Sequence, residues 1–423
     1  MKKSFTTLSY AFLFGALLSL LPVASMAMAE DSVLPLEETR DWAVLADGRV
    51  KPLLTYANET VLSVTGRKKV SGLDSLEIFW GYVLAPEDFR DRPLIRVESP
   101  TLKETLGLDA SARRFSFEEI MGSVQFQELA RSAMDRQRDD MDLTPLEKDA
   151  LSVYSKAARV AELMQGSSLT IIPLADRDGS WSTPIAIQSS TDPKIETIKV
   201  KFGELVTAYD QGDSQAFRAA AGSLRIELRN VNPALYPSET VIDRELFYED
   251  MNPFGKAWKF YLLGTLVILL LGFSTKRWLY VSALVLLGAG FACHTMGVGL
   301  RWSIGGRAPV SNMYESLIFM GWGIMAIGFV QEAIYKKRFF ALAGGLMSFI
   351  CLAFSENLPI DSSISPLVPV LAHTSWLAIH VMTIMLSYSA FALAMILAHF
   401  ALFTQLWRPN RDDLIRSLAL LLY

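Results

Sequence analysis

Histidine is rare in this chain, and its positions concentrate metal-binding chemistry in one part of it. The sequence of 423 residues has only four histidines: His294, His373, His380 and His399. A neutral imidazole binds iron or zinc through one ring nitrogen, and an ionisable group inside an apolar segment usually faces other helices rather than lipid. The alternative for each histidine is a hydrogen bond between helices without any ligand. The candidate ligands thus lie in the last third of the chain.

The residues around His380 have helical spacing within an apolar segment at about 376–403. Thr383 and Ser387 lie three and seven residues after His380, so the three side chains share one helix face, where a hydroxyl is able to orient the ring. His399 lies roughly 28 Å further along such a helix at 1.5 Å per residue. One metal ion therefore does not bridge His380 and His399.

Five apolar segments must position these residues, because a span of a bilayer takes roughly 20 apolar residues. The segments lie at about 260–274, 278–300, 313–334, 339–355 and 376–403. Basic residues mark every second connection, as Lys276-Arg277, Lys336-Lys337-Arg338 and the tail residues Arg408 and Arg411. The positive-inside rule places these connections in the cytoplasm, and the loops 301–312 and 356–375 outside it.

Arg301 and Arg307 lie in the first of these outer loops, where the positive-inside rule disfavours basic residues. Such exceptions suggest a function for the side chains, and the alternative is that two arginines are too few to change the orientation. In the same loop, Asn312 with Glu315 three residues later is typical of a capping box at a helix start. We therefore expect Glu315 to cap the helix that begins there.

The first 29 residues have the order of a signal peptide. A basic start, an apolar stretch and small residues precede Glu30, at Lys2-Lys3, 10–21 and Ala27-Met28-Ala29. Cleavage after Ala29 exports the chain from Glu30 onward, whereas the alternative is an uncleaved anchor, although the stretch is shorter than a full span. The predicted parts are a signal peptide at 1–29, an exported soluble domain with its tether at 30–252, and a membrane domain at 253–423.

The exported domain is expected to be α+β with helix predominating. Thr144-Pro145-Leu146-Glu147 is an N-cap pattern for a helix that runs to about residue 165. A strand at 168–173, a turn and a second short strand at Trp181 come next, and the proline-containing stretch 232–253 is expected to be a tether to the membrane. The domain has no cysteine, histidine or phosphate-binding glycine loop, which favours docking of a partner over catalysis.

The composition supports one class of protein and excludes another. Hydrophobic residues make up 51% of the chain and the mean hydropathy is positive, so part of the chain lies in a lipid bilayer. The 40 basic and 44 acidic residues nearly cancel without long runs of one sign, which excludes a nucleic-acid partner. The predicted fold is an all-α polytopic membrane helix bundle preceded by an exported soluble α+β domain that is mainly helical.

Two ordered blocks of motifs lie in the membrane part. The first contains Arg301-Trp302, Gly306-Arg307, Pro309 and Ser311-Asn312-Met313-Tyr314-Glu315-Ser316-Leu317. The second contains Pro366-Leu367-Val368-Pro369, Trp376-Leu377-Ala378-Ile379-His380-Val381 and Met385-Leu386-Ser387-Tyr388. In order and spacing, these blocks resemble the CcsA/ResC family of cytochrome c assembly proteins. Asp47-Gly48-Arg49-Val50-Lys51-Pro52 also resembles an extra domain that precedes the family's membrane region in some bacteria.

The resemblance implies a multi-pass subunit of the cytochrome c biogenesis machinery in the bacterial inner membrane. Such a subunit binds haem b and delivers it at the outer face for thioether attachment to an apocytochrome c with a CxxCH motif, beside a ResB/CcsB-type membrane partner. His380 matches an outer axial ligand to haem iron, and His294 is a further candidate within the bundle. Arg301 or Arg307 would pair with the haem propionates by bidentate hydrogen bonds; His373 and His399 receive no role.

The chain departs from the family pattern after these blocks. It lacks the tryptophan-rich motif of the WGxxWxWDPKE kind and the second outer histidine, and we expect it to be truncated before them. Cys293 and Cys351 are single residues in separate segments, so neither a c-type cytochrome nor thiol exchange is expected. Two alternatives stay open: a non-catalytic scaffold that docks the ResB-type partner, and an exporter of haem or another solute without ligation chemistry.

Overall fold

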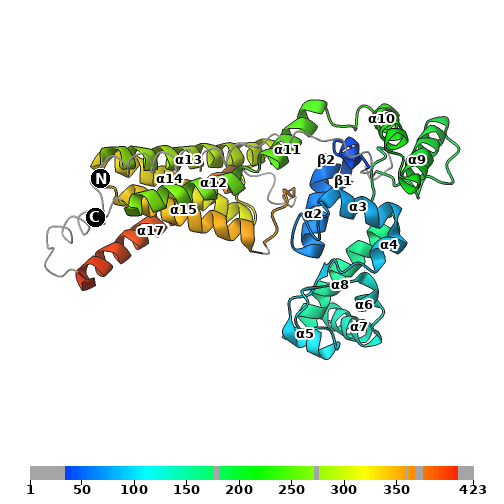
Figure 1. Ribbon diagram of the computed structural model, residues 1–423, viewed down its shortest axis with the longest axis horizontal. Helices are drawn as coiled ribbons and strands as arrows, with labels where there is room; N and C mark the ends of the chain where they lie inside the picture. Colours follow the sequence, from blue (N-terminus) through cyan, green and yellow to red (C-terminus); the bar gives the residue numbers. More distant parts are fainter. Residues whose placement is uncertain (1–33, 175–180, 271–275, 359, 367–374, 408–423) are drawn as a thin grey trace, which may run out of the picture.

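The computed structural model describes residues 34–174, 181–270, 276–358, 360–366 and 375–407. The chain is elongated, with long helices at one end and a domain of shorter helices at the other (Figure 1). These parts are named the bundle, from residue 253 onward, and the N-terminal domain, up to residue 231. The predicted signal peptide lies outside the described residues.

The N-terminal domain is mainly helical and holds two antiparallel sheets of two strands each. Its elements are η1 (Leu36–Thr39), β1 (Ala43–Ala46), β2 (Arg49–Pro52), α2 (Leu53–Thr65), α3 (Ser75–Leu84), α4 (Pro86–Arg90), β3 (Ile95–Arg96), α5 (Pro100–Thr105), β4 (Arg114–Phe115), α6 (Phe117–Met121), α7 (Val124–Arg138), α8 (Pro145–Met164), α9 (Pro193–Gln211) and α10 (Ser214–Val231). β1 pairs with β2, and β3 with β4. Trp42 and Trp80, fully buried with their ring centroids 5.8 Å apart, lie in one continuous apolar core.

The predicted helix start at Thr144 is confirmed, because α8 begins at Pro145 and the Thr144 and Glu147 side chains cap each other's backbone amides. The strands predicted after α8 are present only in part. Ile172 forms a bridge with Ser182, while the amide of Leu45 donates to Thr170 O at 3.0 Å. This segment therefore pairs with itself at one position and also adds to the edge of β1.

The stretch 232–253, predicted to be a tether to the membrane, is largely helical. α11 (Glu239–Met251) continues after Asn252 into α12 (Pro253–Leu270). The prolines at 233, 237 and 253 lie outside the helix interiors, where a missing amide hydrogen costs no helical hydrogen bond. Ile242 and Glu245 are buried, and α11 lies between the N-terminal domain and the bundle (Figure 1). The first apolar helix consequently starts at 253 rather than 260.

The described chain has five helices long and apolar enough to cross a membrane, which confirms a helical polytopic membrane protein. After the α11–α12 pair these are α13 (Arg277–Gly305), α14 (Met313–Tyr335), α15 (Phe339–Asn357) and α17 (Ser375–Trp407). α13 runs past its predicted end at 300 and stops where Gly306 has a φ of 64°, a left-handed cap that glycine adopts without strain. Arg301 therefore lies in a helix, not in a loop as expected.

α14 joins its neighbours through hydrogen bonds from their side chains to its carbonyls. Met320 O accepts from Ser389 of α17 at 3.0 Å, and Gly321 O accepts from Ser348 of α15 at 2.8 Å. A Cβ at Gly323 would lie 2.5 Å from Ser389 Oγ, so the close approach of α14 and α17 requires glycine there.

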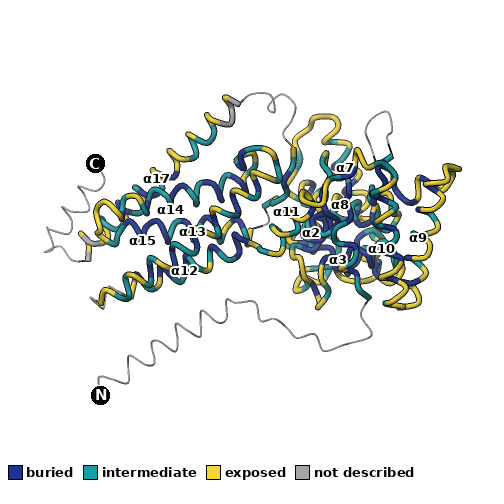
Figure 2. Tube along the Cα trace, turned by 90° about the horizontal axis from the view of Figure 1, so that it is seen from above, coloured by how far each residue is buried: buried dark blue, intermediate teal, exposed yellow. Residues whose placement is uncertain are grey.

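The half of α17 nearer to the N-terminal domain diverges from the bundle (Figure 2). None of its described side chains before Ser389 is buried, whereas Leu393 and Leu397 pack against the other helices. Packing within the bundle thus fixes the far half of α17 more firmly than the half that carries His380.

Candidate functional site

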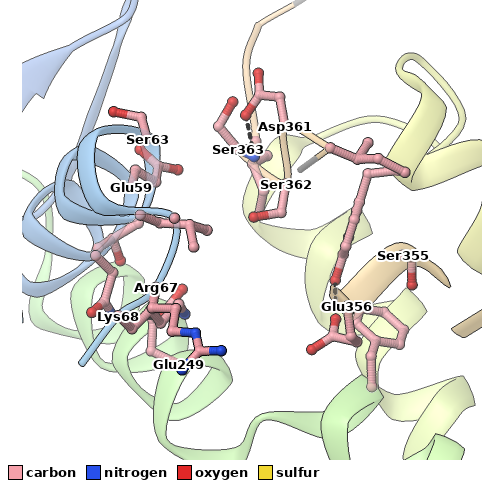
Figure 3. Close-up of a pocket in the computed structure, with 18 of the residues that line it drawn as sticks. Glu59, Ser63, Arg67, Lys68, Glu249, Ser355, Glu356, Asp361, Ser362 and Ser363 are labelled. Atoms are coloured by element: carbon pink, nitrogen blue, oxygen red, sulfur yellow. Dashed lines mark hydrogen bonds and ion pairs between the residues drawn. The ribbon is translucent and has the colours of Figure 1, made fainter. Parts of the chain in front are cut away.

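A polar cavity of about 730 Å³ lies where the N-terminal domain meets the bundle (Figure 3). Glu59 of α2, Lys68 after α2 and Glu249 of α11 line one side, and Glu356 of α15 lines the other. Burial raises the pKa of the Glu59 carboxyl even though Lys51 Nζ lies 2.6 Å from it. Charges of both signs therefore line this cavity, beside apolar side chains such as Phe254 and Ile360.

Arg301, Arg307 and Glu315 form a buried ion-pair cluster at this end of the bundle, the domain-facing end. Arg301 Nη2 lies 3.0 Å from one carboxylate oxygen of Glu315, and Arg307 Nη1 lies 2.7 Å from the other. The side chains of Arg301 and Glu315 are each 1% exposed. The rings of Tyr248 and Tyr314 have centroids 6.0 and 5.0 Å from the Arg301 guanidinium carbon, which adds cation–π attraction. The two arginines predicted to bind a carboxylate already hold one from their own chain.

The capping prediction at the start of α14 is correct for Asn312 and wrong for the Glu315 side chain. Asn312 Oδ1 accepts from the amide of Glu315 at 2.8 Å. The Glu315 carboxylate does not return to Asn312, but accepts from the amide and hydroxyl of Ser311 and from the two guanidinium groups. Two cationic guanidinium groups attract the carboxylate more strongly than one neutral backbone amide does, so the arginines take it away from the cap.

Both arginines also donate to backbone carbonyls in the segment between α15 and α17. Arg301 donates to Ser362 O at 2.9 Å, and Arg307 donates to Ser365 O at 2.7 Å. Propionate binding by Arg301 or Arg307 stays a prediction, and it requires the displacement of one of these protein partners.

His294 is fully buried in the bundle, and each ring nitrogen has a hydrogen-bond partner. Nε2 donates to Ile318 O of α14 at 2.8 Å, and Nδ1 accepts from the Tyr261 hydroxyl of α12 at 3.1 Å. A carbonyl oxygen only accepts hydrogen bonds, so Nε2 must carry the ring proton and Nδ1 is the acceptor. His294, in α13, thus connects α12, α13 and α14. Its role as a haem ligand stays a prediction, and binding iron would require one of these hydrogen bonds to break.

His380 is exposed on the diverging half of α17. Thr383 Oγ1 donates to Ile379 O at 2.8 Å and Ser387 Oγ donates to Thr383 O at 3.0 Å, so both hydroxyls bond to their own helix instead of orienting the ring. Large apolar side chains around His380 are also exposed, namely Trp376, Ile379, Leu386 and Tyr388. An exposed imidazole on an apolar surface is the donor arrangement that fits one face of a haem.

The other histidines lie apart from His380. His399 lies in the far half of α17, and its Nδ1 bonds to Met395 O at 2.8 Å, while His373 lies outside the described residues. Across the described ranges, no group of three or more histidine, cysteine or acidic side chains is placed to hold a metal ion. The structure brings Arg301 and Arg307 together on Glu315 and leaves His294 and His380 in different surroundings.

The sequence analysis did not predict two buried polar contacts at the site. Tyr261 and Glu315 are polar residues in apolar helices, and that placement was the available signal that each has a buried partner. Which partner each one meets depends on helices distant in the sequence, as with the bond from Tyr261 to His294.

Comparison with known proteins shows that part of the chain is similar to cytochrome c assembly proteins. Residues 310–419 match the family described as Cytochrome C assembly protein. The chain is 27% identical over 374 residues to Protein NrfI of Wolinella succinogenes, which covers 84% of this chain and 40% of NrfI. It is 36% identical over 125 residues to the Cytochrome c biogenesis protein CcsA of Synechocystis sp., covering 29% of this chain and 37% of CcsA.

A second CcsA, from Prochlorococcus marinus, is 32% identical over 171 residues, which are 39% of this chain and 54% of that protein. The chain therefore spans about two fifths to one half of the length of these curated relatives.

Proposed function

Residues 310–419 belong to the cytochrome c assembly protein family, and from this premise we propose that the chain binds haem at the domain-facing end of its bundle and delivers it for attachment to apocytochrome c. The general role, in cytochrome c biogenesis, is the one that the names of the CcsA relatives give. The proposal adds the cofactor, haem b, and the place where it is presented.

His380 is the single observation that carries the proposal. It lies within the matched residues, and it is the one exposed imidazole in the domain-facing half of α17 among the described residues. Neutral imidazole is a common axial ligand of haem iron, and the exposed apolar side chains beside it offer a surface for the macrocycle. A bound haem would supply the iron that His380 holds and the vinyl groups that accept cysteine thiols.

The membrane orientation in this proposal is inferred from charge. The basic residues Lys276, Arg277, Lys336, Lys337 and Arg338 lie at the end of the bundle opposite the N-terminal domain, which supports a cytoplasmic position for that end. The domain-facing end then lies on the outer, periplasmic side of the bacterial inner membrane. In this arrangement residues 1–29 are the signal peptide, 30–252 the exported domain and 253–423 the membrane domain.

The proposed partners are a ResB/CcsB-type membrane protein and an apocytochrome c with a CxxCH motif. The family resemblance supports both, and the exposed apolar face of α17 offers a surface in the membrane for the first. In this proposal the chain holds iron through the imidazole of His380, and the helices that contact α17, namely α14 and α15, keep that imidazole in place.

The test compares haem bound by the full chain and by His380→Ala after purification in detergent. We expect the variant to lose haem or the absorption spectrum of imidazole-ligated haem, and added imidazole to restore that spectrum. His399→Ala is the matched control, because His399 is exposed on the same helix but bonds to Met395 O. Identical haem content and spectra in all three proteins would refute the assignment.

A non-catalytic scaffold is the second candidate, and the ion pairs of Arg301 and Arg307 with Glu315 favour it because they occupy the predicted propionate donors. Pull-down of the ResB-type partner by full-length chain carrying His380→Ala separates the two functions. A scaffold keeps both the partner and cytochrome c maturation in this variant, whereas a haem-delivering subunit keeps the partner and loses maturation.

A further inference from the structure

Four consecutive backbone carbonyls in the connection between α15 and α17 accept hydrogen bonds from side chains. This segment, residues 362–365, is named the strap. The donors are Arg301 Nη1 to Ser362 O at 2.9 Å, Arg301 Nη2 and Asn312 Nδ2 to Ser363 O at 3.3 Å each, Arg49 Nε to Ile364 O at 2.6 Å, and Arg307 Nη2 to Ser365 O at 2.7 Å. The strap lies in neither helix nor sheet, so these side chains satisfy carbonyls that regular structure would otherwise satisfy.

Arg49 is the donor that reaches the strap from the N-terminal domain. Its two terminal nitrogens bind the Glu245 carboxylate of α11 at 2.7 and 2.8 Å, while its Nε is left for Ile364 O. Burial of Arg49 opposes its charge, but Glu245 outweighs this and raises the pKa of the guanidinium. One planar guanidinium thus ties β2, α11 and the strap together, which an ammonium group does not do with the same geometry.

The turn before Arg49 also fits closely against Pro366, the residue that follows the strap. Gly48 has a φ of 79°, and a Cβ there would lie 3.1 Å from Pro366 Cγ. Ile364 is 5% exposed, and a Cβ at Gly305 would lie 3.1 Å from its Cγ2. The strap is therefore packed on both sides, against the β1–β2 turn and against the end of α13.

The position of the strap matters because the chain enters α17 at Ser375, nine residues after Pro366. In the described part of α17, no side chain before Ser389 is buried. Because few side chains fix this half of the helix by packing, the anchored strap that precedes it in the chain has more influence on where His380 lies.

We infer that Arg49 is a positioning residue, through which the N-terminal domain fixes the strap and with it the His380 end of α17. The inference rests on the proposed function where it concerns haem, but the positioning of α17 is independent of haem. On this inference the N-terminal domain is part of the haem site's support and not only a docking module.

The test uses the full chain with Arg49→Gln, and Arg40→Gln is the matched control. Arg40 also joins the N-terminal domain to α11, with both oxygens of Asp250 at 2.7 Å, but none of its described contacts is with the strap. Spin labels at His380→Cys and Ile334→Cys, in chains whose Cys293 and Cys351 are replaced by alanine, report the spread of distances from α17 to α14. We expect Arg49→Gln to broaden this distribution and Arg40→Gln to leave it unchanged.

A second measurement concerns haem in the chain with His380 intact. Arg49→Gln is expected to reduce the imidazole-ligated fraction of the spectrum. Added imidazole should restore this fraction, and Arg49→Lys should retain it only partly. An unchanged distance distribution in Arg49→Gln would overturn the inference, and a broadened one with an unchanged haem spectrum would overturn its link to His380. If the unsubstituted chain binds no haem, the proposed function fails, while the spin-label result still decides whether Arg49 positions α17.

Discussion

Substitution of Glu315 by glutamine tests whether the buried ion-pair cluster holds the domain-facing end of the bundle. Glutamine keeps the size of the side chain and one carbonyl acceptor, but it removes the negative charge that two arginines share. Arg307 is 12% exposed and is able to turn to solvent, whereas Arg301 is 1% exposed and stays buried. The variant therefore leaves a buried cation without its counter-ion.

The expected cost is set by this burial. Breaking a buried ion pair by removing one partner destabilises a protein by about 3–5 kcal/mol. Every 1.4 kcal/mol is a factor of about ten, so the equilibrium constant of unfolding rises by roughly a hundred-fold to several thousand-fold. The contacts of Arg301 with Tyr248 and with the carbonyl of Ser362 remain, which places the cost at the lower end of that range.

The assay is unfolding of the detergent-solubilised full chain by increasing mole fractions of sodium dodecyl sulfate, monitored by circular dichroism. Glu239→Gln is the matched control, because Glu239 pairs with Arg229 at 2.5 Å while its side chain is 73% exposed. An exposed pair of this kind contributes about 1 kcal/mol or less. If Glu315→Gln unfolds at the same detergent mole fraction as Glu239→Gln, the cluster does not stabilise this end of the bundle and the reasoning is refuted.

The buried histidine and the cap of α8 each give a further prediction. His294→Gln should lower the free energy of unfolding by about 1–3 kcal/mol, because Tyr261 and Ile318 lose a well-placed buried partner. The same variant should leave the haem spectrum unchanged. Loss of haem at unchanged stability would instead support a ligand role for His294. Hydrogen bonds from the Thr144 amide and hydroxyl hold the pKa of Glu147 below its ordinary 4.5, so that stabilisation is present above pH 4.5 and disappears as the pH falls through the lowered value. The difference in amide exchange of the first turn of α8 between the unsubstituted chain and Thr144→Ala should accordingly shrink in acid, and a difference independent of pH would contradict this.

Helix starts and membrane helices were predictable where their causes are local. The cap of α8 depends on Thr144 and Glu147, three residues apart, and both are found in the predicted roles. The apolar segments had to be helices, because a chain in lipid must satisfy its backbone hydrogen bonds within each segment. The prediction failed at α11, where the prolines of 232–253 suggested a tether although none of them lies inside the helix.

The sequence alone determined the number and type of the membrane segments, the cap at Asn312 and the histidine with the strongest resemblance to a haem ligand. Tertiary structure decided which partners the polar side chains have. Glu315 has a local option as a cap, yet Arg301 and Arg307 take its carboxylate, since two cationic guanidinium groups outweigh one neutral amide. Arg49 and Ile364 are 315 residues apart, and only packing of the N-terminal domain against the bundle brings them within hydrogen-bonding distance.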